Sequence, residues 1–190
     1  MQPFGGVALD LNGVRRVFDG RHVVIDHFNL QVAAGEFLAI LGPSGCGKST
    51  LLRMVAGLED MTGGVIEIGG KDVSPLPPAK RGISMVFQSY ALYPHLSVFD
   101  NIAFQMREHT DLPEDAVRDL VLMKLNAVGL RGAADLMPSE LSGGMARRVA
   151  LARAVALDPQ LMLYDEPFTG LDPISLGVIA RLIRTLNDSL

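Results

Sequence analysis

The chain has little cysteine, no long apolar run and no excess of positive charge. Its 190 residues include one cysteine, which excludes a disulfide framework and a multi-cysteine metal site. No apolar stretch approaches the roughly 20 residues that cross a bilayer, and Met1 to Phe4 do not resemble a signal peptide. The net charge of −4 argues against a broad basic face for nucleic acid. We therefore expect a soluble, intracellular domain.

The sequence does contain enough apolar residues for a folded core. Hydrophobic residues make up 48% of the chain and charged residues 20%, which argues against disorder. The β-favouring stretches at residues 23–25 and 28–32 predict short strands. The apolar run at residues 36–41 predicts a buried parallel strand. Leu51, Leu52 and Val55 then follow at helical spacing, and we expect Gly57 to end that helix.

The middle of the chain has helical periodicity instead. Asp111 and Glu114 flank Pro113 at a predicted helix start, and the apolar face of this helix ends before Gly129. That face comprises Val117, Leu120, Val121, Leu125 and Val128. We therefore expect a helical insertion at residues 89–147 in an α/β core formed by residues 1–88 and 148–190.

A strand and a helix are predicted near the C-terminal end. Residues 161–164 are β-favouring and lead directly into two acids. Asp172 and Pro173 suit the N-cap and first turn of a final helix. Its predicted apolar stripe comprises Ile174, Val178, Ile179, Leu182, Ile183 and Leu186.

One glycine-rich segment predicts a phosphate site. Residues 42–50 match the pattern G-x-x-x-x-G-K-[ST] between a predicted strand and a predicted helix. The backbone amides of such a loop and the positive end of the following helix favour phosphate oxygens. Lys48 would contact the β- and γ-phosphates, and Ser49 would ligate Mg²⁺. The candidate residues are Gly42, Pro43, Ser44, Gly45, Cys46, Gly47, Lys48, Ser49 and Thr50.

Two acids supply the second half of the predicted site. Asp165 and Glu166 follow the strand at residues 161–164, at the end where open α/β sheets bind ligands. Asp165 would hold Mg²⁺ through water, and Glu166 would orient the water that attacks a phosphoanhydride. The phosphate loop together with this acid pair predicts nucleotide hydrolysis.

Further motifs resemble the ATP-binding cassette (ABC) ATPases. Residues 141–145 (LSGGM) are similar to the LSGGQ signature of that family, and Gln88 is similar to its Q-loop glutamine. Residues 169–172 (TGLD) resemble the D-loop, and Phe18 stands where the family carries an aromatic that stacks on adenine. The resemblance implies a P-loop NTPase (RecA-like) core with an antiparallel β subdomain and an inserted helical subdomain.

The resemblance also implies roles and partners. ATP and Mg²⁺ would be the ligands, with Glu166, Lys48 and Gln88 as catalytic residues and Gln88 as a further metal contact. Ser142, Gly143, Gly144 and Asp172 would contact ATP in a head-to-tail homodimer of cassettes. Physically, Ser142 can cap a helix whose first amides form an anion site. A membrane permease at the cytoplasmic face of the inner membrane would be the other partner, and the cassette would not bind cargo.

The sequence departs from the family in two places. Met145 replaces the usual glutamine of the signature, which removes one polar contact. The family's switch histidine follows a further strand, and no residue after Leu190 is available to supply it. We therefore interpret the chain as a C-terminally truncated cassette, which alone would bind ATP weakly and hydrolyse it slowly.

The transported substrate has two candidates. Residues 86–98 resemble maltose-type sugar-importer cassettes, whereas residues 106–110, 137–148 and 172–174 resemble those of phospholipid (Mla or Mce-linked) transporters. We favour phospholipid and keep the sugar importer as the alternative. A second alternative is an ATP-binding cassette with little hydrolysis, because the region of the switch histidine is absent. A cassette acting in DNA repair or on ribosomes and a GTPase or kinase are weaker alternatives.

Two surface features complete the sequence-based hypotheses. The apolar and aromatic segment from Tyr90 to Leu96 is expected to bind the permease, unless it packs internally. His95 is expected at the surface or in local packing. Arg147, Arg148 and Arg153 are expected to form a solvated helix face rather than a nucleic-acid patch.

Overall fold

The computed structural model describes residues 6–87 and 91–189. The chain separates into two compact units, one made of Met1–Ile83 with Asn187–Leu190 and the other of Ser84–Leu186. Within the described residues, no helix has both the length and the apolar character that crossing a bilayer requires.

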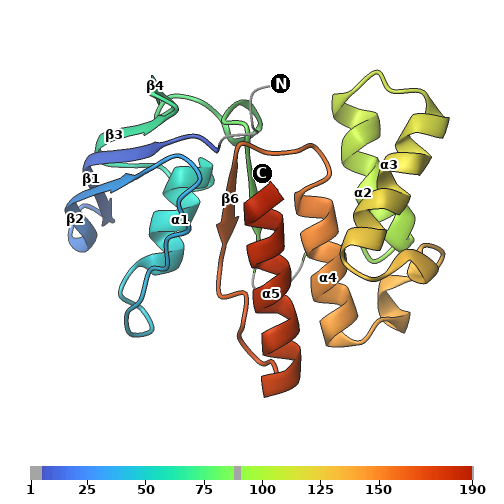
Figure 1. Ribbon diagram of the computed structural model, residues 1–190. Coiled ribbons are helices and arrows are strands. Elements are labelled where there is room, and N and C mark those ends of the chain that lie inside the picture. Colours follow the sequence, from blue (N-terminus) through green and yellow to red (C-terminus); the bar gives the residue numbers. More distant parts are fainter. Residues whose placement is uncertain (1–5, 88–90, 190) are drawn as a thin grey trace. The chain divides into compact units, whose positions relative to one another are not determined.

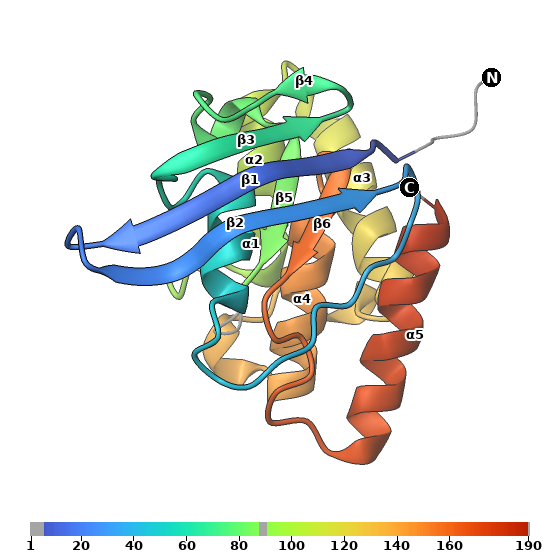
Figure 2. The same cartoon turned by 90° about the vertical axis from the view of Figure 1, so that its left-hand side faces the viewer.

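An antiparallel sheet of four strands forms the first unit, in the order β2-β1-β3-β4 (Figure 2). Leu9 on β1 lies opposite Val32 on β2 and Ile68 on β3, and all three side chains are buried. These apolar cross-strand partners favour the observed register. The expected antiparallel β subdomain is therefore confirmed. The strands are β1 (Leu9–Phe18), β2 (His22–Val32), β3 (Gly63–Ile68) and β4 (Lys71–Asp72).

Helix α1 (Lys48–Ala56) lies against one face of this sheet (Figure 1). It buries Leu51 and Val55, as predicted, and also Met54, whereas the predicted Leu52 is only partly buried. The helix ends at Gly57, as predicted, with a φ of 75° in the left-handed region that glycine adopts readily.

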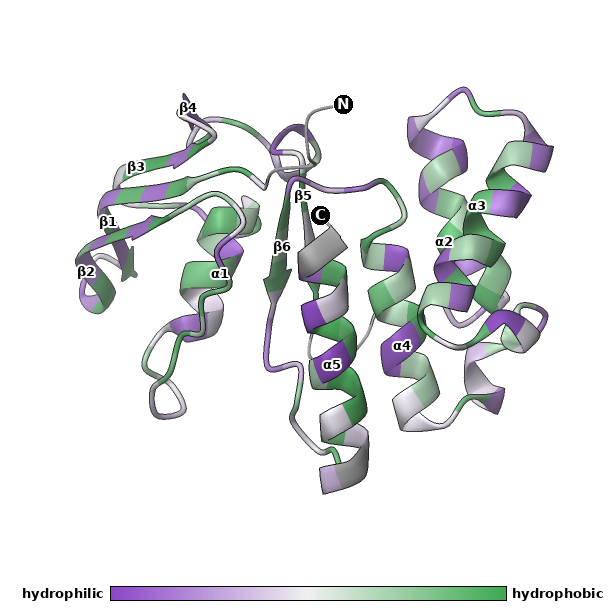
Figure 3. Cartoon of the chain, in the orientation of Figure 1, coloured by the Kyte–Doolittle hydropathy of each residue, from purple (hydrophilic) through white to green (hydrophobic). Residues whose placement is uncertain are grey.

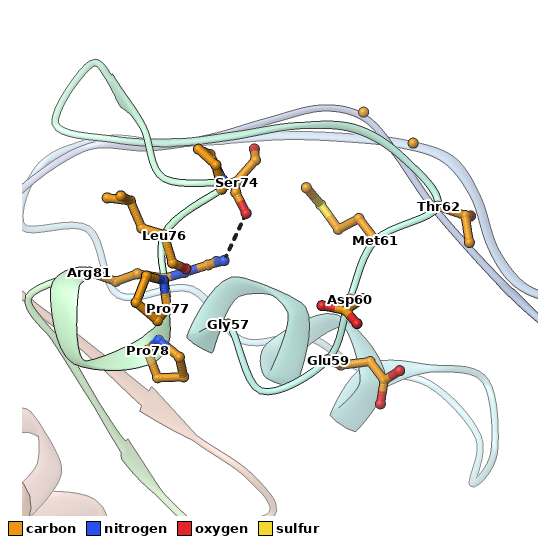
Figure 4. A pocket seen from close by; sticks show the side chains of 13 residues that line it. Gly57, Glu59, Asp60, Met61, Thr62, Ser74, Leu76, Pro77, Pro78 and Arg81 are labelled. Atoms are coloured by element: carbon orange, nitrogen blue, oxygen red, sulfur yellow. Dashed lines mark hydrogen bonds between the residues drawn. The ribbon is translucent and has the colours of Figure 1, made fainter.

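The C-terminal end of α1 is closed by the buried guanidinium of Arg81, which follows the short 3-10 helix η1 (Pro78–Lys80). The Arg81 Nη1 group donates to the carbonyls of Met54 (2.8 Å) and Val55 (2.9 Å), and Nη2 donates to that of Ser74 (3.3 Å). Burial lowers the pKa of Arg81. Arg81 and Ser74 border a pocket of about 670 Å³, drawn in Figure 4. The pocket contains none of the residues predicted to bind nucleotide.

Residues 36–41 do not form the strand predicted from their apolar sequence. Phe37, Leu38 and Leu41 are exposed, Leu41 to 90%. A strand requires hydrogen-bonding neighbours, and the described strands pair as β2-β1-β3-β4 and β5-β6 without this segment. The prediction was wrong because an apolar run does not specify the distant segment with which it would pair.

The second unit joins a two-stranded sheet to several helices. Strand β6 forms at the predicted residues, and the amide of Asp165 extends its pairing with β5 by donating to the carbonyl of Val86 (3.0 Å). One apolar cluster packs α4 and α5 with Val86. The elements of this cluster are β5 (Ile83–Val86), α4 (Gly143–Ala154), β6 (Leu161–Tyr164) and α5 (Pro173–Ser189).

Helix α5 begins as predicted, because the Asp172 carboxylate accepts a hydrogen bond from the amide of Ser175 (3.0 Å). Ile179, Ile183 and Leu186 are buried in the apolar cluster. Val178 was also predicted to belong to the stripe, but it is exposed. The side chain of Ile174 lies outside the described residues.

A second apolar cluster in this unit packs the helices of the region predicted to be helical. Helices α2 (Val98–His109) and α3 (Glu114–Ala127) pack together and against α4. Figure 3 shows hydrophobic and hydrophilic colours alternating around both helices, as expected for amphipathic elements. Short 3-10 helices η2 (Arg131–Ala133) and η3 (Pro138–Glu140) then lead to α4.

Candidate functional site

The predicted phosphate loop lies in the first unit, between the segment at residues 36–41 and α1. Residues 42–46 are exposed, and Gly47 forms the N-cap of α1 with a φ of 97°. A Cβ at this position would lie 3.2 Å from Cγ1 of Val24, so both the backbone angle and the close packing favour glycine. No side chain caps α1, and therefore its first amides retain their affinity for an anion.

Lys48 folds back over this loop. Its Nζ group donates to the carbonyls of Gly42 and Pro43, both at 2.8 Å, and lies 3.9 Å from the Sγ atom of Cys46. The lysine charge is thus held at the loop that the sequence assigns to phosphate. Ser49 and Thr50 occupy the first turn of α1, and Cys46 is an exposed free thiol.

Phe18, the candidate adenine-stacking residue, ends β1 in the same unit. The Arg16 guanidinium lies over its ring, 4.3 Å from the centroid. Arg16 is also paired with Glu59. A cation therefore covers one face of Phe18, and this neighbour could not be inferred from the sequence motif.

The predicted metal ligand Asp165 and the predicted catalytic residue Glu166 have contrasting environments in the second unit. Asp165 is buried, with 6% of its surface exposed, whereas Glu166 is exposed. Glu166 has a φ of 49°, which is uncommon for any residue other than glycine. The chain turns at this residue, two positions after the end of β6.

The turn that follows is held by two polar residues. Thr169 Oγ1 donates to Oε2 of Glu166 (3.0 Å), and the amide of Thr169 donates to the Glu166 carbonyl (3.3 Å). Arg147 on α4 donates from Nη2 to the Thr169 carbonyl (2.8 Å). The sequence motifs do not indicate that Thr169 and Arg147 hold this turn. The one sequence signal for this contact is an arginine placed among the apolar residues of α4.

The signature segment begins α4. The Ser142 hydroxyl accepts a hydrogen bond from the amide of Met145 (3.2 Å), so the predicted cap is confirmed. Gly143 and Gly144 form the first turn of the helix. Met145 packs against the apolar cluster of α2 and α3, which gives a physical reason for an apolar residue at this position.

The arginines of α4 do not form the expected solvated face. Arg147 is buried, with 2% of its surface exposed. Arg148 donates to the carbonyls of Gly144 (3.4 Å) and Val128 (3.2 Å), and Arg153 donates to that of Ala91 (2.8 Å). Burial lowers the pKa of Arg153. The expectation was wrong because carbonyl groups of neighbouring loops, which helical periodicity does not reveal, bind these guanidinium groups.

The predicted permease segment has both partly buried and exposed residues. Leu92 packs against both apolar clusters of the second unit, whereas Tyr93 is 40% exposed. The Tyr93 ring lies 5.5 Å from that of Phe104, which is also exposed, and 6.1 Å from that of His95. Gln88 and Tyr90 lie outside the described residues.

The predicted site residues are divided between the two units. The phosphate loop and Phe18 belong to the first, whereas the acids, Asp172 and the signature segment belong to the second.

Residues 25–169 match the family model described as ABC transporter. The chain belongs to the ABC transporter family. The P-loop fold expected for this cassette is confirmed by the solved structures that it resembles.

This ABC cassette is similar to proteins of known structure and named function. It is 56% identical over 176 residues to the intermembrane phospholipid transport system ATP-binding protein MlaF of Haemophilus influenzae, an alignment that covers 90% of the chain and 67% of that protein. The sn-glycerol-3-phosphate import ATP-binding protein UgpC of Bordetella pertussis is 48% identical over 92% of the chain and 48% of its own length.

Among solved structures, a dimeric post-hydrolysis state of the cassette MJ0796 bound to ADP and Pi has a TM-score of 0.83. The two sequences are 30% identical, and the match covers 94% of this chain and 82% of MJ0796. The chain spans about two thirds of the length of the MlaF proteins from H. influenzae and Escherichia coli.

Proposed function

We propose that this cassette is the ATP-binding and ATP-hydrolysing subunit of a transporter that moves phospholipid across or between membranes. The observation that carries the proposal is the phosphate loop at residues 42–50. There, an uncapped helix N-terminus and the Lys48 charge converge on one exposed backbone turn. Both features favour a polyphosphate, because the amides supply directional donors and the lysine supplies charge.

Lys48 would exchange its two loop carbonyls for phosphate oxygens when ATP binds. Charge-assisted hydrogen bonds to phosphate are stronger than bonds to neutral carbonyls, so the exchange favours binding. Phe18 would provide the aromatic surface for adenine, and Ser142 with Gly143 and Gly144 would contact the γ-phosphate of a second cassette. Asp172 and Gln88 complete the residues that we assign to the nucleotide.

Glu166 would act as the group that orients the attacking water. Its exposed carboxylate is fixed at the end of β6, whereas the neighbouring Asp165 is buried. The hydroxyl of Ser49 and the carboxylate of Asp165 are hard oxygen donors of the kind that Mg²⁺ prefers together with phosphate and water. When bound, Mg²⁺ would neutralise charge that develops on the β- and γ-phosphates.

Two protein partners follow from this assignment. A second copy of the cassette would form a head-to-tail dimer, and dimeric cassettes among the solved relatives support this proposal. A permease would hold the dimer at the cytoplasmic face of the inner membrane. The exposed Tyr93 and Phe104 rings are better candidates for that contact than Leu92, which packs inside the unit.

The phospholipid assignment rests on sequence similarity. MlaF of H. influenzae is 56% identical to the chain, against 48% for the glycerol-3-phosphate import protein UgpC. The proposal also includes a division of the chain into two parts. Residues 1–88 and 148–190 would form an α/β core, and residues 89–147 would form a helical subdomain.

ATP binding and hydrolysis by the full-length protein that carries this sequence test the proposal. Replacing Lys48 with alanine should weaken ATP binding at least about tenfold, since a charge-assisted contact is lost. Replacing Glu166 with glutamine should reduce hydrolysis by about 10²–10³ while ATP remains bound, by analogy with loss of one preorganised catalytic group. Fluorescent ATP titration and phosphate release measure the two effects.

Lys71→Ala serves as the matched control, because Lys71 is an exposed lysine on β4 in the same unit. It should bind and hydrolyse ATP as the unaltered protein does. Equal ATP affinity in the Lys48 and Lys71 variants would contradict the phosphate assignment. Competition between ATP and GTP then distinguishes an ATPase from a GTPase.

A further inference from the structure

A buried arginine links the signature helix to the turn that carries the proposed water-orienting acid. Arg147 lies on the second turn of α4, and only 2% of its surface is exposed. Its Nη2 group donates to the carbonyl of Thr169 at 2.8 Å. Both residues belong to the second unit, so the contact is internal to one compact body.

Thr169 in turn contacts Glu166 twice. Its hydroxyl donates to Oε2 at 3.0 Å, and its amide donates to the Glu166 carbonyl at 3.3 Å. One residue thus restrains both the backbone and the carboxylate of Glu166. The second bond closes the turn that places Glu166 at a φ of 49°.

The backbone of Glu166 needs such restraint. A non-glycine residue in the left-handed region is disfavoured, so this conformation persists only where its surroundings hold it. The Glu166 side chain is also exposed, and water would let an unrestrained carboxylate rotate among its rotamers. A group that orients water is effective only when its own direction is fixed.

We propose that Thr169 and Arg147 are positioning residues for Glu166. Thr169 fixes the direction of the carboxylate, and Arg147 fixes Thr169 by anchoring its carbonyl to α4. The inference rests on the proposed function, because it assumes that Glu166 orients the attacking water. Neither residue contacts substrate in this account, so both act on turnover through Glu166.

Replacing Thr169 with valine tests the proposal by removing the hydroxyl while keeping the shape of the side chain. In the full-length protein, kcat should fall at least about tenfold, because small losses of alignment carry large rate costs. The dissociation constant for ATP and the melting temperature should stay close to those of the unaltered protein. Thr169→Ser retains the hydroxyl and should restore most of kcat.

Thr110→Val is the matched control. The Thr110 hydroxyl donates to the Met106 carbonyl (2.7 Å) at the end of α2, in the same unit. This variant should hydrolyse ATP at the unaltered rate. Arg147→Met should lower kcat in the same direction as Thr169→Val.

A double variant separates positioning from a general structural role. If Thr169 acts through Glu166, adding Thr169→Val to Glu166→Gln should cause no further loss of rate in single-turnover hydrolysis. Multiplicative losses, or a Thr169→Val protein with unaltered kcat, would overturn the positioning role alone. An unaltered protein without ATP hydrolysis would overturn the proposed function and this inference together.

Discussion

At the scale of single residues, Asn101 shows how one buried amide can hold a loop. Its side chain is fully buried at the start of α2 and accepts a hydrogen bond from the Tyr93 amide (2.8 Å). Its Nδ2 group donates to the carbonyls of Tyr93 (3.1 Å), Leu96 (3.0 Å) and Ser97 (3.0 Å). Asn101 therefore ties the segment with the exposed aromatic rings to α2.

Replacing Asn101 with leucine should lower the free energy of unfolding by about 2–3 kcal/mol, because partly buried backbone groups lose their partners. The midpoint of urea-induced unfolding measures the change. Asn126→Leu makes the same replacement at an exposed position on α3 and should shift stability by less than about 0.5 kcal/mol. Similar shifts for the two variants would show that the Asn101 amide does not support the loop.

At the scale of secondary-structure elements, one arginine joins α2 to the start of α3. Arg107 donates from Nη1 to Asp100 (3.0 Å) and from Nε to Glu114 (3.1 Å). A hydrogen bond from the Ser97 hydroxyl lowers the pKa of Asp100 below its ordinary value of 3.8, and Arg107 lowers this pKa as well. Arg107 also lowers the pKa of Glu114. Both carboxylates are therefore stabilised in their charged form by the folded protein.

This arrangement predicts a specific pH dependence. A carboxyl group whose pKa is lowered by folding adds stability above its unfolded pKa, and this contribution is lost as the pH falls through the folded pKa. Asp100→Asn should therefore cost about 0.5 kcal/mol at pH 7, a small value because the pair is partly exposed. The difference from the unaltered protein should shrink as the pH falls below 3.8.

Thermal unfolding at several pH values measures this difference. Asp119→Asn, at an exposed position on α3, controls for the loss of one negative charge. A stability difference for Asp100→Asn that stays constant from neutral to acidic pH would contradict the role of the ionised carboxylate.

Elements that depend on local signals were predictable, and those that depend on distant partners were not. Gly57 ends α1, Ser142 caps α4 and Asp172 caps α5 as the sequence indicates, because capping involves neighbouring residues only. The strand predicted at residues 36–41 is absent from the described sheets. The bonds of Arg147 and Arg153 to distant carbonyls were likewise missed, since helical periodicity does not reveal what lies opposite a side chain.

At the scale of the whole molecule, the proposed function requires two copies of the chain. In the head-to-tail arrangement that we propose, Ser142 and the first turn of α4 complete the nucleotide site of the partner. The Ser142 hydroxyl already caps its own helix, so the amides of this turn are held in place before a nucleotide arrives. A bulky cation at position 142 should therefore block assembly without altering the phosphate loop of the same chain.

Ser142→Arg, introduced together with Glu166→Gln to prevent turnover, should abolish the ATP-dependent dimer while each monomer still binds ATP. Light scattering coupled to size-exclusion chromatography measures the assembly. Ser142→Ala loses only the cap, worth about 1 kcal/mol, and reports how much of the effect comes from helix stability.

Ser139→Arg places the same charge at an exposed position on η3 and should still permit dimers. An ATP-dependent dimer of the Ser142→Arg protein would mean that the signature segment does not face a second nucleotide.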